Sequence, residues 1–230
     1  MKILAIETSG PTGNICLAVR ERIVCEHFLG EGMNHGREIV PAIDKIMSSV
    51  GWSAEDLELV AVSIGPGSFT GLRVGLSIAK TLALAGEVWV VGVPTLDVMV
   101  ENVPMEYEYA CPMTDARRGE INSSLFQVVN YGWMRQWDYQ TATAEDLCVR
   151  LPAGTCLLGE AVNIYREKFA RREDWIILAD EDWIPKAAWV ARLGYRRFTG
   201  GQRDDPHQLV PIYLSHPPVL EKKALGSENK

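Results

Sequence analysis

The sequence has few histidines, no long apolar run and no signal-peptide pattern. Four histidines occur in 230 residues, and none has the His-Glu-x-x-His spacing of a zinc peptidase helix. No apolar run approaches about 20 residues, the length that spans a bilayer. Met1 leads directly into an apolar segment without the basic and apolar regions of a signal peptide. We therefore expect a cytoplasmic protein that does not contact membranes.

An excess of basic residues is also missing. The chain has 23 Lys and Arg against 30 Asp and Glu, and its formal net charge is −7. A protein that binds RNA by itself needs a basic face, because it must neutralise phosphates. We therefore do not expect the chain to bind RNA by itself, and any RNA is expected to be held mainly by a partner.

The cysteines give no disulfide or zinc pattern. They are odd in number and form no Cys-x-x-Cys pair, so neither a disulfide framework nor a zinc site is indicated. We expect free thiols, as in a reducing compartment, at Cys16, Cys25, Cys111, Cys148 and Cys156.

The stretch from Ile64 to Ala85 is the most distinctive part of the chain. An apolar run ends at Gly65-Pro66-Gly67, and an apolar helical pattern starts behind Ser68, which predicts a strand, a turn and a helix in direct succession. Free N–H groups at a helix start attract anions. The stretch lacks the Lys-Ser or Lys-Thr of a phosphate-binding loop, however, and Pro66 removes one donor.

Small residues recur every four positions in this helix, at Gly71, Gly75 and Ala79. This spacing places them on one face. Glycine inside a helix costs about 1 kcal/mol relative to alanine, so two glycines need a structural reason. We expect a helix of a partner protein to pack closely against this face. The alternative is that the helix packs tightly onto the protein's own sheet.

The order of predicted elements is βββαβαβα in the first half. Strands are expected at 2–8, 15–20, 23–29, 59–64 and 88–93, and helices at 35–50, 69–85 and from Thr95. The second half repeats the order in shortened form, with strands at 107–113, 121–130, 133–139, 155–158 and 175–178, a short helix after Thr143, and helices at 162–171 and 185–198. The polar segment 101–106 divides the halves. The predicted subdomains are 1–102 and 103–220, followed by a disordered tail, 221–230.

Three segments carry a family resemblance: Ser63 to Gly75, Ile3 to Ser9, and Asp115 to Glu120. Together they resemble the TsaB (YeaZ) family, formerly described as M22 glycoprotease-like. The resemblance implies a role in the bacterial machinery that installs threonylcarbamoyladenosine (t6A) at adenosine 37 of tRNA. It also implies an α/β fold of the actin-like ATPase type (ASKHA, ribonuclease H-like), built from a duplicated βββαβαβα unit.

The resemblance further implies partners. They are a catalytic TsaD-type paralogue, an ATP-hydrolysing TsaE-type subunit that docks on the pair, and a separate enzyme that supplies threonylcarbamoyl-adenylate. The predicted contact uses helices 35–50 and 69–85, two from each partner, and the same surface should form a two-fold homodimer when the paralogue is absent. The predicted interface residues are His35, Ile39, Ile43, Phe69, Gly71, Leu72, Arg73, Gly75, Ile78, Ala79 and Leu82.

In a duplicated fold of this type, nucleotide and metal lie between the halves, and the first hairpin of each half faces the phosphates. The hairpins here carry Glu7 and Thr8 in one half and Asp115 and Arg117 in the other. Two carboxylates could hold hydrated Mg²⁺, so weak binding of ATP, ADP or Mg²⁺ is open although no cofactor is required. The alternative is that Glu7 and Asp115 bond to backbone N–H groups of their own hairpins.

One comparison bears on catalysis. In the TsaD family the strand after the glycine-marked helix ends in Gly-Val-Asn-His-x-x-x-His, and the two histidines hold the catalytic metal. The matching stretch here, Gly92 to Met99, has Thr95 and Met99 at those places, and neither suits a hard or borderline cation. We therefore expect a non-catalytic scaffold subunit without catalytic residues. The alternative is an ATP-binding or M22-type peptidase-like enzyme that acts on its own.

Overall fold

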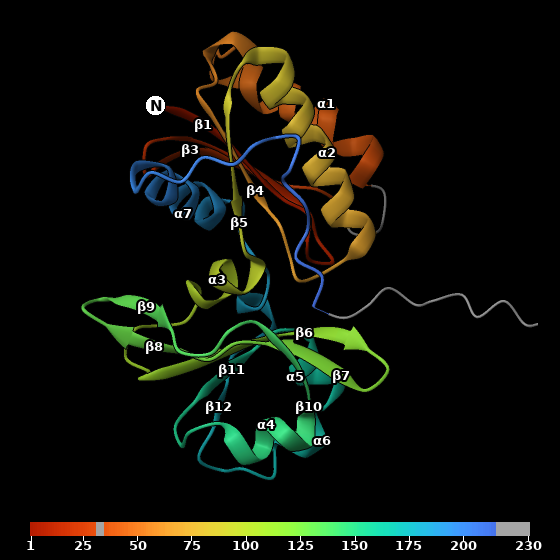
Figure 1. Cartoon of the computed structure of the whole chain (residues 1–230), viewed down its shortest axis with the longest axis vertical. Helices are drawn as coiled ribbons and strands as arrows, with labels where there is room; N and C mark the ends of the chain where they lie inside the picture. The colour runs from red at the N-terminus through yellow and green to blue at the C-terminus, as the bar shows by residue number, and fades with distance from the viewer. Residues whose placement is uncertain (31–34, 215–230) are drawn as a thin grey trace, which may run out of the picture.

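The computed structural model describes residues 1–30 and 35–214, without the His35 side chain. The predicted tail, 221–230, and residues 215–220 of the predicted second subdomain lie outside the described residues. Figure 1 shows two units, one above the other, with a short helix between them. We call them the first unit and the second unit.

The first unit is built on a five-stranded sheet with the order β3-β2-β1-β4-β5. Its strands are β1 (Lys2–Glu7), β2 (Asn14–Val19), β3 (Arg22–Phe28), β4 (Leu59–Ser63) and β5 (Trp89–Val93). The first three form an antiparallel meander, while β4 and β5 run parallel to β1. The predicted strands of the first half are confirmed.

Helices cover both faces of this sheet. Helices α1 (His35–Ser49) and α2 (Phe69–Gly86) lie on one face, and α7 (Ala187–Thr199) lies on the other (Figure 1). Alternate residues of a strand point to opposite faces, so Leu4 and Ile6 pack beneath α1 and α2, whereas Ile3 and Ala5 pack beneath α7. The central strands are therefore apolar on both faces, in agreement with their unbroken apolar sequence.

The second unit contains a seven-stranded sheet. Its main path is β10-β7-β6-β11-β12, and the β8–β9 ribbon attaches to β6. The strands are β6 (Tyr109–Arg117), β7 (Glu120–Ser123), β8 (Phe126–Val129), β9 (Gly132–Arg135), β10 (Gln140–Thr143), β11 (Cys156–Leu158) and β12 (Ile176–Ile177). The helices are α3 (Thr95–Val100), between the units, α4 (Ala144–Arg150), α5 (Glu160–Ile164) and α6 (Arg166–Phe169). The described residues also contain two 3₁₀ turns, Ala54–Asp56 before β4 of the first unit and Asp180–Asp182 after β12.

Three predicted elements of the second half are wrong. The strand expected at 133–139 ends at Arg135 as β9, and the main sheet takes the unpredicted strand β10 instead. The strand expected at 121–130 is two strands, because β7 pairs with β6 and β10 while β8 pairs with the start of β6 and with β9. The change of partner falls at Ser124, whose hydroxyl donates to the Trp137 carbonyl at 2.7 Å. The helix expected at 162–171 is divided at Tyr165 into α5 and α6. The strand break depends on pairing with segments distant in the sequence, so the continuous apolar composition of 121–130 does not reveal it.

The predicted second subdomain, 103–220, also needs correction, because α7 packs on the first sheet. Its buried residues Ala187 and Val190 join the same core as Ile3. The Asn14 side chain of β2 accepts a hydrogen bond from the Ala187 N–H and donates to the Pro185 carbonyl, the latter at 3.0 Å. The chain then pairs with β5 through an isolated bridge at 204. Residues 185–214 therefore belong to the first unit.

Candidate functional site

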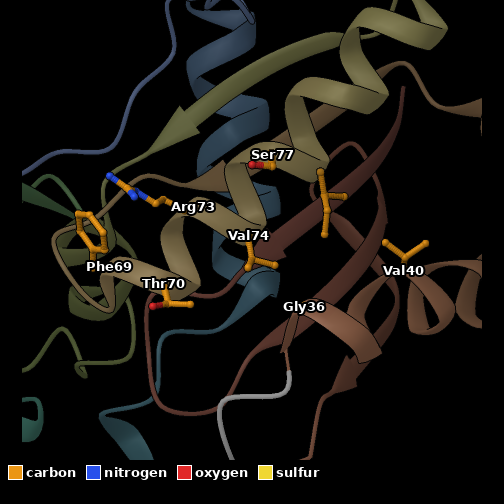
Figure 2. A pocket seen from close by; sticks show the side chains of 8 residues that line it. Gly36, Val40, Phe69, Thr70, Arg73, Val74 and Ser77 are labelled. Atoms are coloured by element: carbon orange, nitrogen blue, oxygen red, sulfur yellow. The ribbon is translucent and has the colours of Figure 1, made fainter.

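A shallow groove lies on the surface of the first unit between α1 and α2. It encloses about 450 Å³ and is open to solvent. Figure 2 shows Gly36 and Val40 from α1 on one side, facing side chains from α2. The exposed fractions of Val40 and Phe69 are 56% and 43%. The lining residues are Gly36, Val40, Phe69, Thr70, Arg73, Val74, Ser77 and Ile78. We call this surface the α1–α2 groove.

One end of the groove is an aromatic and cationic cluster. The Arg73 guanidinium carbon lies 3.8 Å from the centre of the Phe69 ring, and the rings of Phe69 and Tyr213 are 5.3 Å apart. The Arg73 Nε donates to the Tyr213 hydroxyl at 3.4 Å. A cation over a ring face is attracted by the ring quadrupole. Arg73 is thus held at the rim of the groove with its charge exposed.

The small-residue face of α2 is turned away from this groove. A Cβ placed on Gly71 would lie 1.9 Å from the Thr8 carbonyl oxygen, and one on Gly75 would lie 2.3 Å from the Thr8 hydroxyl. Ala79 is fully buried in the core beneath α1 and α2. The expected use of this face against a partner is therefore wrong. The alternative is confirmed: the end of β1 runs so close to α2 that side chains would not fit between them.

Other predicted interface residues divide between core and surface. Ile39, Ile43 and Leu72 are buried in the first unit, because they form the inward face of their helices. Phe69 and Arg73 are exposed, Ile78 and Leu82 are half-buried, and the His35 side chain lies outside the described residues. The prediction missed Val40, Thr70, Val74, Ser77 and Tyr213. Helices α1 and α2 each carry apolar residues outside the stripe that faces the core. This wider apolar surface could have indicated the two valines.

Glu7 is buried at the end of β1 and is bonded within its own unit. Its Oε1 accepts hydrogen bonds from the Ser9 N–H at 2.6 Å and the Ser9 hydroxyl at 2.5 Å, and its Oε2 accepts from the Ser63 hydroxyl. Burial raises the pKa of Glu7 although these bonds act in the opposite direction. The neighbouring Thr8 is fully buried too. Glu7 therefore bonds to the backbone of its own hairpin, as the alternative to a metal site predicts.

Asp115 has the same arrangement in the second unit. Its Oδ1 accepts from the Arg117 N–H two residues ahead at 3.0 Å, as Glu7 does from Ser9. The Arg117 guanidinium lies 3.3 Å from Oδ2, and most of that side chain is exposed. The Asp115 N–H donates to Glu160 at 3.2 Å, and burial raises the pKa of Glu160. Both predicted acids therefore fix their own hairpins by the same local bond.

The two positions that match metal ligands in the TsaD family lie inside the molecule. Thr95 and Met99 are each 1% exposed, on α3. The Thr95 N–H donates to the Gly65 carbonyl at 2.8 Å, and Met99 packs in the core of the second unit. Within residues 1–30 and 35–214, no three His, Cys, Asp or Glu side chains gather closely enough to hold a metal ion. Both positions are therefore buried, and among the described residues neither side chain belongs to a group of metal-binding type.

The strand order and helix placement define an actin-like ATPase fold. The structure is similar to YeaZ from Pseudomonas aeruginosa, with a TM-score of 0.82 at 21% identity, over 93% of this chain and 99% of that one. Of the helices in the described part of the chain, none is both long and apolar enough to cross a membrane.

Sequence relatives narrow this class. The TsaB protein of Haemophilus influenzae is 30% identical over 241 residues, covering 99% of each chain. That of Bacillus subtilis is 29% identical over 93% of this chain and 94% of its own. Both are named tRNA threonylcarbamoyladenosine biosynthesis proteins. The family described as TsaD, tRNA N6-adenosine threonylcarbamoyltransferase, matches residues 32–137. The chain belongs to the TsaB family, so the resemblance predicted from its motifs is confirmed.

Proposed function

We propose that this chain is a non-catalytic scaffold subunit in t6A biosynthesis. It pairs with a catalytic TsaD-type paralogue through the α1–α2 groove, and with a second copy of itself when the paralogue is absent. The observation that carries the proposal is the groove itself, where Val40 and Phe69 leave apolar surface open to water on two packed helices. Apolar surface of this kind favours a protein partner.

The partner's chemistry follows from the groove. Its lining includes the aliphatic side chains of Val40, Val74 and Ile78, and Arg73 adds a positive charge at the rim. The TsaD family matches residues 32–137, which include α1 and α2, so a paralogue would present an equivalent helix pair. Two helices from each chain can interlock along their ridges and form a four-helix contact. A carboxylate on the partner would pair with Arg73.

A division of labour explains the remaining features. Thr95 and Met99 are buried where the paralogue has metal-binding histidines, and neither suits a hard or borderline cation, so the transfer step belongs to the paralogue. The net charge of −7 leaves the tRNA to the complex as a whole. A TsaE-type ATPase docks on the pair, and the scaffold works in the cytoplasm without a required cofactor.

The test is the oligomeric state of purified protein, alone and mixed with its TsaD-type paralogue, measured by light scattering after size exclusion. Val40→Asp should weaken both pairings by roughly 100-fold or more, because an uncompensated charge in a buried contact costs about 3 kcal/mol. The matched control is Val149→Asp, on α4 of the second unit, where the side chain is 85% exposed. A substitution at Gly75 is unsuitable, because it would strike Thr8 inside the chain.

Two outcomes would contradict the proposal. One is a wild-type monomer that ignores the paralogue. The other is Val40→Asp protein that pairs as well as Val149→Asp protein. The alternative, an enzyme acting alone, needs Glu7 for nucleotide. It would gain support if millimolar ATP with Mg²⁺ raised the melting temperature of the wild type but not of Glu7→Ala.

A further inference from the structure

Helix α3 lies between the two units and contributes to both cores (Figure 1). Its residues Leu96 and Met99 pack in the core of the second unit. Val98 packs in the core beneath α7 in the first unit. Between these apolar residues is Asp97, whose side chain is only 22% exposed. A carboxylate at this depth needs hydrogen-bond partners, since an unpaired buried charge is costly.

Asp97 takes one partner from each unit. Its Oδ1 accepts a hydrogen bond from the Tyr139 hydroxyl at 2.6 Å, and Tyr139 packs against the core of the second unit. Its Oδ2 lies 3.4 Å from Nη1 of Arg197, which belongs to α7 and thus to the first unit. Arg135 of β9 stacks on Tyr139, with the guanidinium carbon 4.2 Å from the ring centre. Charge-assisted bonds such as these are stronger than neutral ones.

Within residues 1–30 and 35–214 the backbone crosses between the units twice, and the second crossing is held beside α3 as well. The Asn102 side-chain amide donates to the carbonyls of Asp182 and Ile184, at 2.8 and 2.9 Å. These carbonyls lie on the segment that leads back to α7. Two units joined by two chain crossings can rotate about them as a hinge, unless side chains between the units oppose the rotation.

We infer that Asp97, Tyr139 and Arg197 form an inter-unit bridge that fixes the orientation of the two units. The bridge joins the second unit to α7 through α3, so any rotation at the crossings must separate Asp97 from Tyr139 or from Arg197. It acts independently of the α1–α2 groove and does not depend on the proposed function.

The test uses two conservative substitutions and one control. Asp97→Asn keeps the shape but removes the negative charge, so Arg197 loses its ionic partner and the Tyr139 hydroxyl loses a charge-assisted acceptor. Tyr139→Phe removes only the hydroxyl. The control is Glu145→Gln, which breaks the ion pair with Lys168, at 2.6 Å, inside the second unit. Residual dipolar couplings of backbone amides, fitted separately for each unit, report whether the units move together.

In wild type and Glu145→Gln, both units should give the same alignment tensor. In Asp97→Asn and Tyr139→Phe, the tensor magnitudes should diverge, and amides of α3 should exchange about 5- to 30-fold faster, while those of β1 and β4 stay protected. Equal tensors in all four proteins would overturn the inference. It would also fail if Tyr139→Phe lost the fold of both units, because the contact would then stabilise the whole molecule instead of setting an orientation.

Discussion

Replacing Gly71 with alanine tests whether the small-residue face of α2 belongs to this chain's own core. The new methyl group would lie 1.9 Å from the Thr8 carbonyl oxygen, so the helix or the end of β1 must move by about 1 Å or more. That end of β1 is held on both sides. The Ser68 N–H donates to the Ser9 carbonyl at 2.8 Å, and Glu7 accepts from the Ser9 N–H.

The expected magnitude has two parts. Overpacking against a restrained backbone costs about 3 kcal/mol, and replacing a helical glycine by alanine returns about 1 kcal/mol. The free energy of unfolding of Gly71→Ala should therefore fall by about 2 kcal/mol. For a chain of this size this corresponds to a melting temperature lower by about 4–8 °C.

The assay is urea and thermal unfolding followed by circular dichroism at two protein concentrations. The matched control is Gly36→Ala in α1, where the nearest atom, on Val74, would be 3.8 Å from the new Cβ. Its stability should be unchanged or higher by up to about 1 kcal/mol. If Gly71→Ala unfolded like the wild type but changed its oligomeric state, the face would be a partner contact and the reasoning would be refuted.

Two further predictions concern buried polar side chains. Because burial raises the pKa of Glu7 above 4.5, the folded protein retains a proton that the unfolded chain loses, so its stability relative to Glu7→Gln should fall as pH rises from 4.5 through the raised pKa. Urea unfolding of both proteins from about pH 4 to 7.5 measures this difference, and a constant difference would refute it. Asn14→Ala strands the Ala187 N–H and should cost about 2–3 kcal/mol in the same assay. The exposed control Asn163→Ala should cost little, and equal losses would contradict the role of Asn14 in holding the start of α7.

Local patterns were sufficient for much of the first unit. Alternation and unbroken apolar runs predicted the β1–β3 meander and the β4–α2 succession, because the hydrophobic pattern within each segment reflects its own burial. The local sequence pattern of α7 does not indicate on which sheet the helix packs. Its apolar face, with Ala187 and Val190, shows that the helix covers a sheet but does not specify which one. The contacts that fix this choice, such as the hydrogen bonds of Asn14 to Pro185 and Ala187, join residues more than 170 positions apart.

The candidate site was predictable only in part for the same reason. The spacing of Gly71 and Gly75 correctly indicated close approach to α2, but the approaching group is the backbone at Thr8, which spacing within the helix does not identify. Phe69 and Arg73 were predicted, whereas Tyr213, which stacks beside them, lies 140 positions further along the chain. Whether these side chains contact a partner stays a prediction.

Because α7 packs on the first sheet, that sheet is synthesised well before the helix that covers one of its faces. Strands β1, β4 and β5 are complete when Val93 has been made, but the helix that covers their second face begins at Ala187. At a translation rate of about 5–20 residues per second, the interval is roughly 5–20 s. Throughout it the apolar side chains of Ile3 and Ala5 lack their cover, so the nascent chain offers a chaperone a defined target and a limited time in which to bind.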